Sequence, residues 1–231
     1  MAALSELTII NTIYALYETD DAGWDSTSSE YVTAREYINA AVKDWASRDT
    51  WRDLWTTLTA STQTVPTLVK TTTAGTYAYT CPTDFAYPNS WVRTTDGSNN
   101  TFWSVVTPEF AAKYASDYSY YVYFTGSVKA GYVLNFNPRI TLTTGHTINY
   151  EYYKTPTVYS GTTSTSEIPD PYYCVYYALA RFLRNDGEDF SYEEGKAREI
   201  MDSMLTRNQQ GYWDISNAID EPLNMGAGFG N

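Results

Sequence analysis

The residue pattern changes twice, near residues 61 and 168, and these changes constrain the fold more than any other feature. Outside the middle segment, apolar residues recur every three or four positions, which is typical of helices with one buried face. Between the two changes Thr, Val, Tyr and Gly dominate, which indicates strands joined by turns. We therefore expect an α+β fold, in which N- and C-terminal helices form a helical bundle and an antiparallel β-rich domain is inserted between them.

These changes divide the chain into four parts. Residues 1–60 are predicted to form the N-terminal helices of the bundle, residues 61–167 the β-rich middle domain, and residues 168–207 the C-terminal helices. Residues 208–231 end in a Gly-rich stretch and are interpreted as a flexible C-terminal arm.

The N-terminal part predicts two helices, over residues 4–18 and 29–48. The second has one apolar stripe, made of Tyr31, Ala34, Ile38, Ala41 and Trp45. The spacing of Trp51, Leu54, Trp55 and Leu58 predicts a further helical turn or two.

The middle part predicts a series of strands. Two strands are expected around a turn at Gly75, followed by a hairpin with its turn within residues 96–100. Thr107 and Pro108 suit the cap and first position of a short helix. Three aromatic-rich strands follow, over YYVYFTG, GYVLNFNP and HTINYEYYK.

Helix signals return after residue 168. Asp170 is a candidate N-cap, Pro171 suits the first helical position, and Gly187 marks the end. A second helix is expected from Ser191, where Ser191 and Glu194 fit a capping box.

The first of these helices has aromatic residues on two sides. One side is an ordinary core face, made of Tyr172, Val175, Tyr176, Leu179, Phe182 and Leu183. The other side carries Tyr173, Tyr177, Ala180 and Arg184, where a solvated helix would carry Glu, Lys or Gln. Either the chain itself buries both sides, or this second side contacts another subunit.

Composition excludes several classes of protein. A net charge of −12 argues against tight, sequence-independent binding to nucleic acid, which requires Lys and Arg. The N-terminus lacks the basic residues of a signal peptide, and no apolar run is long enough to span a membrane. Cys81 and Cys174 are expected to be buried free thiols.

Aromatic residues reach 16 % of the chain, with 23 Tyr. Tyrosine combines a large contact area with a polar tip and is favoured at protein interfaces. The candidate interface residues, for contacts with another subunit, a portal or a tail, are Tyr173, Tyr177, Arg184, Tyr212, Trp213 and Phe229. The same composition also suits a sugar-binding platform.

No pattern of catalysis or cofactor binding stands out. His146 has no Cys or Asp partner nearby in sequence, and no zinc, phosphate-loop or nucleophile motif is present. The segment TTDGSNN lacks the closing Glu of a calcium loop and is interpreted as a hairpin tip. We therefore expect no catalytic residue, metal or cofactor, and a protein that is not an enzyme.

Several segments resemble the head-to-tail adaptor (connector, or tail tubular) proteins of tailed bacteriophages. The resemblance covers about residues 4–207. It is carried by YINAAVKDWASRDTWRDLW, TCPTDFAYPNSWV, LNFNPRI and INYEYYKTPTVYS, and most clearly by EIPDPYYCVYYALARFL with FSYEEGKAREIMDSML.

The resemblance implies a structural virion protein of the phage neck, assembled in the host cytoplasm. Such proteins form homo-oligomeric rings, usually dodecamers, under the portal protein, and bind a tail tube, nozzle or other neck protein on their far side. During genome ejection DNA would pass through the lumen without specific binding. No membrane is implied.

The alternative is a carbohydrate- or receptor-binding module of a virion or surface protein. Its aromatic platform would lie in the β-rich domain and include Trp91, Trp103, Tyr120, Tyr121 and Tyr123.

Overall fold

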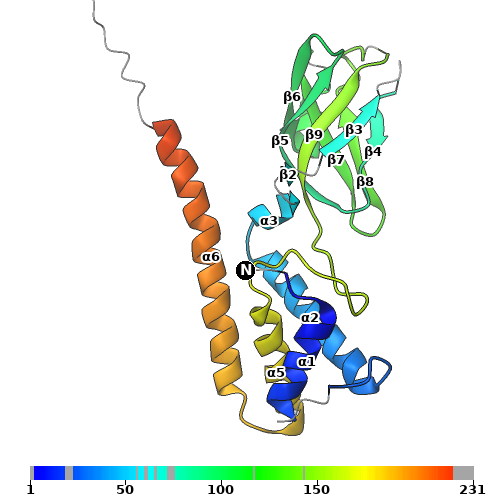
Figure 1. The fold of residues 1–231 in the computed structure, drawn as a ribbon. Coiled ribbons are helices and arrows are strands. Elements are labelled where there is room, and N and C mark those ends of the chain that lie inside the picture. The colour runs from blue at the N-terminus through cyan, green and yellow to red at the C-terminus, as the bar shows by residue number, and fades with distance from the viewer. Residues whose placement is uncertain are drawn as a thin grey trace, which may run out of the picture. The chain divides into compact units, whose positions relative to one another are not determined.

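The computed structural model describes residues 3–18, 23–55, 57–59, 62–64, 67–71, 76–116, 118–142 and 144–220; within 57–71 and 211–220 only the backbone is described. The chain divides into two compact units, a helical unit of residues 1–51 with 157–231 and a β unit of residues 52–156. The sequence pattern placed these divisions near 60 and 168. The expected α+β class is confirmed (Figure 1).

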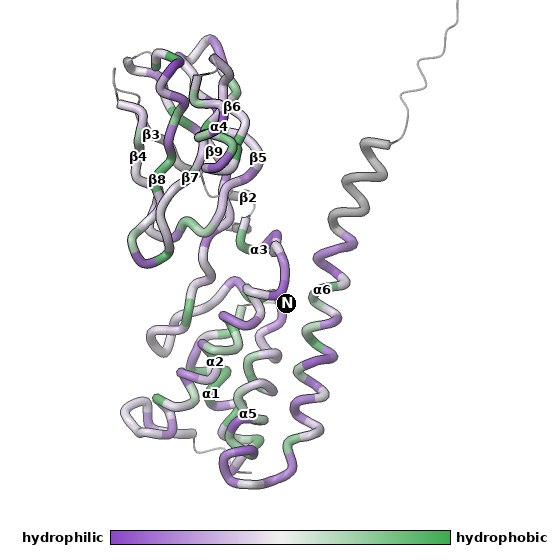
Figure 2. The backbone as a smooth tube through the Cα atoms, turned by 180° about the vertical axis from the view of Figure 1, so that it is seen from behind, coloured by the Kyte–Doolittle hydropathy of each residue, from purple (hydrophilic) through white to green (hydrophobic). Residues whose placement is uncertain are grey.

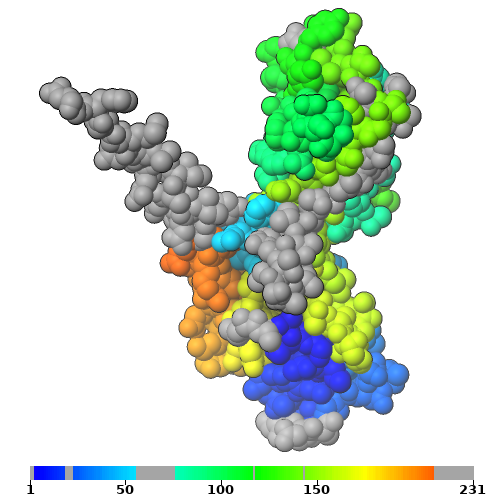
Figure 3. Space-filling model, turned by 45° about the horizontal axis from the view of Figure 1, so that its top comes forward, coloured from blue at the N-terminus to red at the C-terminus, as the bar shows by residue number. Residues whose placement is uncertain are grey.

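The helical unit contains α1 (Glu6–Tyr17), α2 (Ser29–Arg48), α5 (Tyr172–Asp186) and α6 (Ser191–Asp220). Helix α5 packs against the other three, and Figure 3 shows the yellow surface of α5 between orange α6 and blue α1. The predicted stripe of α2 is confirmed, because all five of its residues are fully buried. They pack with Ile9, Ile10 and Ile13 of α1 and Val175, Ala178 and Leu179 of α5 in the buried core of this unit.

Two side chains fix the segment that leads into α5. The Asn39 amide donates to the carbonyl of Tyr159 at 2.9 Å and accepts from its N–H at 2.7 Å. The side chain of Asn39 therefore satisfies the backbone of a buried loop residue, as a neighbouring strand would. The buried Glu6 carboxylate accepts from the Ser164 hydroxyl of the same segment at 3.4 Å, and from Arg35 and Tyr31 of α2.

Helix α6 is longer than the sequence pattern indicated. It continues to Asp220, whereas residues from 208 onward were expected to form a flexible arm. Figure 2 shows hydrophilic residues recurring along α6 with hydrophobic turns between them. Its buried residues Ala197, Met201, Met204 and Asn208 are spaced by three or four positions, which is the period of a helix packed along one side.

The β unit begins with the short helix α3 (Arg52–Trp55) and the hairpin of β1 (Thr57–Thr59) and β2 (Thr62–Thr64). The expected helical turn at Leu58 is wrong, because this residue lies in β1. Threonines flank it on both sides, and their branched Cβ favours a strand over a helix.

The main sheet has the order β3-β9-β5-β6-β7-β8-β4. Its strands are β3 (Thr67–Thr71), β4 (Ala78–Thr80), β5 (Phe85–Thr95), β6 (Asn100–Val106), β7 (Tyr121–Ser127), β8 (Gly131–Phe136) and β9 (Thr147–Lys154). The predicted hairpin of β5 and β6 is confirmed, and Asp96 accepts from the backbone of Ser98 and Asn99 in its turn.

The sheet corrects two predictions. The strands around Gly75 do not pair with each other, since β3 pairs with β9 and β4 with β8 at opposite edges; Gly75 itself lies outside the described residues. The sheet is also mixed, because β6 and β7 run parallel. Helix α4 (Pro108–Lys113) forms the crossover that a parallel pair requires, and Thr107 caps it as predicted.

Candidate functional site

Helix α5 is the centre of the candidate site, because it carries three of the predicted interface residues. The predicted start of α5 is one residue early, because Pro171 is the N-cap and the helix begins at Tyr172. The Asp170 carboxylate accepts from the N–H of Tyr172 at 3.1 Å. Gly187 ends the helix in the left-handed conformation, with φ at 78°, and so the predicted end is confirmed. The helix is thereby held at both ends, with its tyrosines at defined positions against α2 and α6.

Tyr173 lies in the interior of the helical unit. Only 4 % of it is exposed, and its hydroxyl donates to the Asp44 carboxylate of α2 at 2.6 Å. Burial raises its pKa, and the hydrogen bond to Asp44 adds to the shift. Its own chain therefore leaves little of Tyr173 available to another subunit.

The predicted core face of α5 needs a correction at its first turn. Tyr172 was assigned to the core, yet it is 44 % exposed and Tyr173 is buried. Tyr176 is half-buried, whereas Val175, Leu179 and Phe182 are buried as expected. The reason is that α6 packs along α5 and, with α2, covers the side of Tyr173 while leaving the Tyr172 flank open.

The Tyr173 flank of α5 opens into a groove, which we call the arginine groove. It has a volume of about 400 Å³ and is lined from α2, α5 and α6 by Asp44, Arg48, Tyr173, Tyr177, Glu194, Ala197, Arg198, Met201, Asp202 and Leu205. Half-buried Tyr177 accepts a hydrogen bond from Arg181 at 2.5 Å. The Arg181 guanidinium also lies over the rings of Tyr177 and Tyr37, at 4.6 and 5.7 Å.

Arg184 lies at the exposed end of α5. Its guanidinium lies over the Phe190 ring at 4.2 Å and reaches Glu194 at 4.0 Å. Most of its side chain is open to solvent, so its charge is available at the surface. The three predicted residues on α5 thus differ: Tyr173 is buried, Tyr177 lines the groove, and Arg184 stands at its edge.

The other predicted interface residues lie toward the C-terminus. Tyr212 and Trp213 belong to α6, where only the backbone is described, and Phe229 lies outside the described residues.

A second groove lies on the opposite flank of the α5–α6 pair and was not predicted. It is lined by Asp170, Tyr172, Tyr176, Tyr192, Lys196, Glu199, Ile200 and Ser203. Tyr172 and Tyr192 are 44 % and 65 % exposed, so α6 brings two open tyrosines together. The only sequence signal for this groove was the unusual density of tyrosine. The sequence could not show which tyrosines remain exposed, because that depends on where α6 packs.

The aromatic platform expected in the β unit is not assembled as one surface. Trp103 and Tyr121 are buried, at 2 % and 3 % exposure, and the Trp103 indole donates to Thr94 inside the sheet. Trp91 and Tyr120 are open, but they lie near different neighbours: Trp91 meets Phe102 edge-on, whereas Tyr120 packs against Trp103. Tyr123 of β7 is half-buried. With two of the five residues buried and the open Trp91 and Tyr120 packed against different neighbours, these five residues form no single exposed platform for a sugar.

Other chemistry in the described part of the chain is limited. Within these residues no three His, Cys, Asp or Glu side chains gather as metal ligands. Cys81 and Cys174 are both buried thiols that form no disulfide, as predicted. No helix among the described residues is long and apolar enough to cross a membrane.

Comparison with known families decides the identity. The model of the SU10 adaptor protein family matches residues 7–220, which include most of both units. The chain belongs to the SU10 adaptor protein family. The resemblance to phage head-to-tail adaptors is therefore confirmed, and the protein is a structural component of the virion. No curated protein matches the chain.

Membership in the adaptor family sets the general role. Phage adaptors interact with portal and tail proteins, and the family is a structural one, not a class of enzymes. The two grooves beside α5 are open at the surface of the helical unit.

Proposed function

We propose that this adaptor forms a homo-oligomeric ring, a dodecamer, beneath the portal protein in the phage neck. The ring joins the capsid to a tail tube, nozzle or other neck protein and lets DNA pass through its lumen during genome ejection. The single observation that carries the proposal is the family match over residues 7–220, which includes helices of the N- and C-terminal parts together with the inserted β unit.

The helices are proposed to form the bundle that builds the ring. Helix α5 packs against α1, α2 and α6, so one rigid body can present several helix surfaces to its neighbours. Tyr177 and Arg184 lie at its surface, and tyrosine and arginine are enriched among the residues that dominate interface energies. Tyr212, Trp213 and Phe229 are proposed to add contacts with a subunit, the portal or the tail.

The charge distribution supports passage of DNA without binding. Residues 52–156 carry seven Lys or Arg and six Asp or Glu, whereas the rest of the chain carries eight and 21. The helical unit therefore has a net charge of −13 and the β unit of +1. A lumen lined by the helical unit would repel the phosphate backbone, and repulsion keeps a translocating duplex from adhering.

The test is assembly on the portal. The purified chain is mixed with portal rings from the same phage, and the complex is weighed by native mass spectrometry. The proposal predicts a complex that contains a ring of this chain on each portal. A chain that fails to join portal rings under all conditions of salt, pH and concentration would contradict it.

A further inference from the structure

The acidic residues of the helical unit are unevenly distributed. The first Lys or Arg of the chain is Arg35, and so α1 and the first turn of α2 carry no basic residue. Exposed acids lie where α1 ends and α2 begins, and we call Glu18, Asp25 and Glu30 the acidic corner.

The arginine groove, in contrast to the acidic corner, concentrates basic residues. Four of the eight basic residues of the helical unit gather there: Arg48 and Arg198 line it, Arg181 binds its Tyr177, and Arg184 reaches its Glu194. The lining itself carries three acids, Asp44, Glu194 and Asp202, against Arg48 and Arg198. With Arg181 and Arg184, which contact its Tyr177 and Glu194, four arginines face three acids in a unit whose net charge is −13.

Two of the three groove acids already have partners of their own. Asp44 is paired with Arg48 at 2.9 Å and accepts from Tyr173, and Glu194 faces Arg184. Arg181 instead rests on the rings of Tyr37 and Tyr177. A guanidinium held on aromatic faces keeps its full charge and still has N–H donors for a carboxylate.

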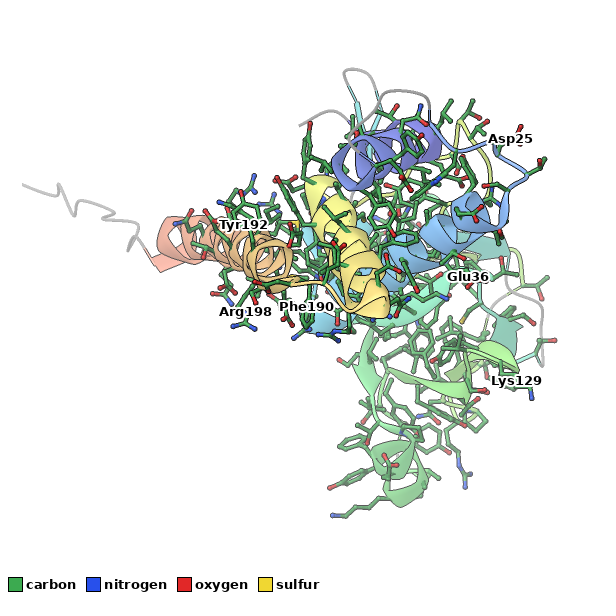
Figure 4. All side chains as sticks on the ribbon, turned by 90° about the horizontal axis from the view of Figure 1, so that it is seen from below. Asp25, Glu36, Lys129, Phe190, Tyr192 and Arg198 are labelled. Atoms are coloured by element: carbon green, nitrogen blue, oxygen red, sulfur yellow. The ribbon has the colours of Figure 1, made fainter. Side chains whose placement is uncertain are left out.

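The two surfaces lie on different sides of one rigid unit. Figure 4 shows Asp25 on the α2 side and Arg198 on the α6 side, with α5 between them. A contact between two different patches on opposite sides of a subunit is heterologous, and repeated contacts of this kind close into a ring when the rotation allows it.

We propose that the acidic corner of one copy docks into the arginine groove of the next copy. This inference rests on the proposed ring and names the surfaces that build it. A second copy is the occupant because the corner carries acids without bases and the groove carries the excess of arginine, so the two match in charge. A contact of either surface with itself would place like charges together.

The experiment uses two charge-reversed variants of the full chain. The groove variant is Arg181→Glu with Arg198→Glu, and the corner variant is Glu18→Lys with Glu30→Lys. All four side chains are exposed, so the fold is retained. Each variant alone should form rings on the portal poorly, with the chain concentration for half-assembly raised by about tenfold or more.

Mixing the two variants provides the decisive readout. The reversed corner of one now matches the reversed groove of the other, and the unchanged corner and groove also match. Mixed rings that contain both variants, detected by native mass spectrometry, are expected. Rings that form from either variant alone as readily as from the wild type would overturn the inference, and so would a mixture that does not assemble.

Matched controls lie in the β unit. Glu109 occupies the same second position of α4 that Glu30 occupies in α2, and exposed Lys129 lies in the turn between β7 and β8. Glu109→Lys and Lys129→Glu should leave assembly unchanged. The milder pair Arg181→Gln with Arg198→Gln should weaken assembly without repulsion, and an unchanged half-assembly concentration would count against the contact.

The outcomes separate the two proposals. Wild-type chain that forms no ring on the portal contradicts the proposed function and this contact with it. Wild-type rings that tolerate both variants contradict only the contact.

Discussion

The hydroxyl of Tyr173 donates to the Asp44 carboxylate at 2.6 Å and thereby ties α5 to α2 across 129 residues of sequence. Removing it by Tyr173→Phe should lower the free energy of unfolding by roughly 1.5 kcal/mol at neutral pH, since the bond is made to a charged group but Arg48 still pairs with Asp44. Urea denaturation measures the change. A variant as stable as the wild type would contradict this role.

The raised pKa values of Tyr173 and Tyr17 should make the fold less stable at alkaline pH. The folded pKa of Tyr173 is raised by burial, that of Tyr17 is raised to about 12 by its hydrogen bond to Asp186, and the unfolded values are about 10. Above pH 10 the unfolded chain loses these protons while the folded chain keeps them. Stability is therefore fully present below pH 10 and falls as pH rises toward 12, by about 1.4 kcal/mol per pH unit for the buried Tyr173. The loss from Tyr17 is smaller, because its bond to Asp186 is exposed and screened by solvent. Denaturation at stepped pH should show a shallower slope for Tyr173→Phe; equal slopes would contradict the assignment.

Glu6 should be a stability residue at the start of α1. It is fully buried, and both Nε and Nη2 of Arg35 lie 2.8 Å from its carboxylate. Glu6→Gln should cost about 2–3 kcal/mol, because the charge of Arg35 loses its buried partner. The exposed Glu30 is the control, and Glu30→Gln should lower the free energy of unfolding far less than Glu6→Gln. Equal losses in thermal or chemical denaturation would refute the difference.

Gly126 should tolerate no side chain. Its φ is +109°, and an added Cβ would lie 2.1 Å from the carbonyl oxygen of Gly131 across the β7–β8 pair. Gly126→Ala should destabilise the β unit by about 3 kcal/mol or more, from the strained φ together with the clash. Gly97 has a φ of +94° with nothing within 4 Å of that Cβ. Gly97→Ala therefore measures the effect of the positive φ alone and should lower the free energy of unfolding by only about 1–2 kcal/mol. A similar loss at both sites would show that the clash at Gly126 contributes nothing.

Tyr177 should matter for assembly more than for folding. It is half-buried in the arginine groove. Tyr177→Glu should block ring formation and leave a folded monomer, because a carboxylate buried in a subunit contact costs several kcal/mol. Tyr177→Phe keeps the ring and is the control. Loss of the cooperative melt in Tyr177→Glu would show that the side chain belongs to the core of its own chain.

Sugar binding should be absent from the β unit. Trp103 and Tyr121 are buried, so these aromatics form no common platform. Titration with glycans should leave the tryptophan fluorescence unchanged, and an array should show no specific signal. A saturable response lost in Trp91→Ala would revive the alternative of a carbohydrate-binding module.

Local patterns predicted the elements of this fold well. The stripe of α2, the cap at Thr107 and the end of α5 at Gly187 all follow from interactions within a few residues. The pairing of β3 with β9 and β4 with β8 does not, because pairing depends on distant partners that carry no local signal. The bond between Asn39 and Tyr159 is equally distant in sequence.

The candidate site could be predicted only in part. The helical period placed Tyr173 and Tyr177 on one side of α5, and both line the arginine groove. The period could not show which flank of α5 is covered by α6. The packing of α6 against α5 determines that Tyr172 is exposed and Tyr173 is buried. The groove arginines come from α5 and α6, which are consecutive, and from α2, which lies far earlier in the sequence, so their clustering emerges only in the folded chain.

Assembly with the portal is the most direct test of the central claim. Cryo-electron microscopy of the wild-type chain mixed with portal rings from the same phage should show a closed ring of twelve copies, with the helical unit of each copy contacting the next. Portal rings that remain bare at every concentration, with the chain dispersed as free monomers, would contradict the claim.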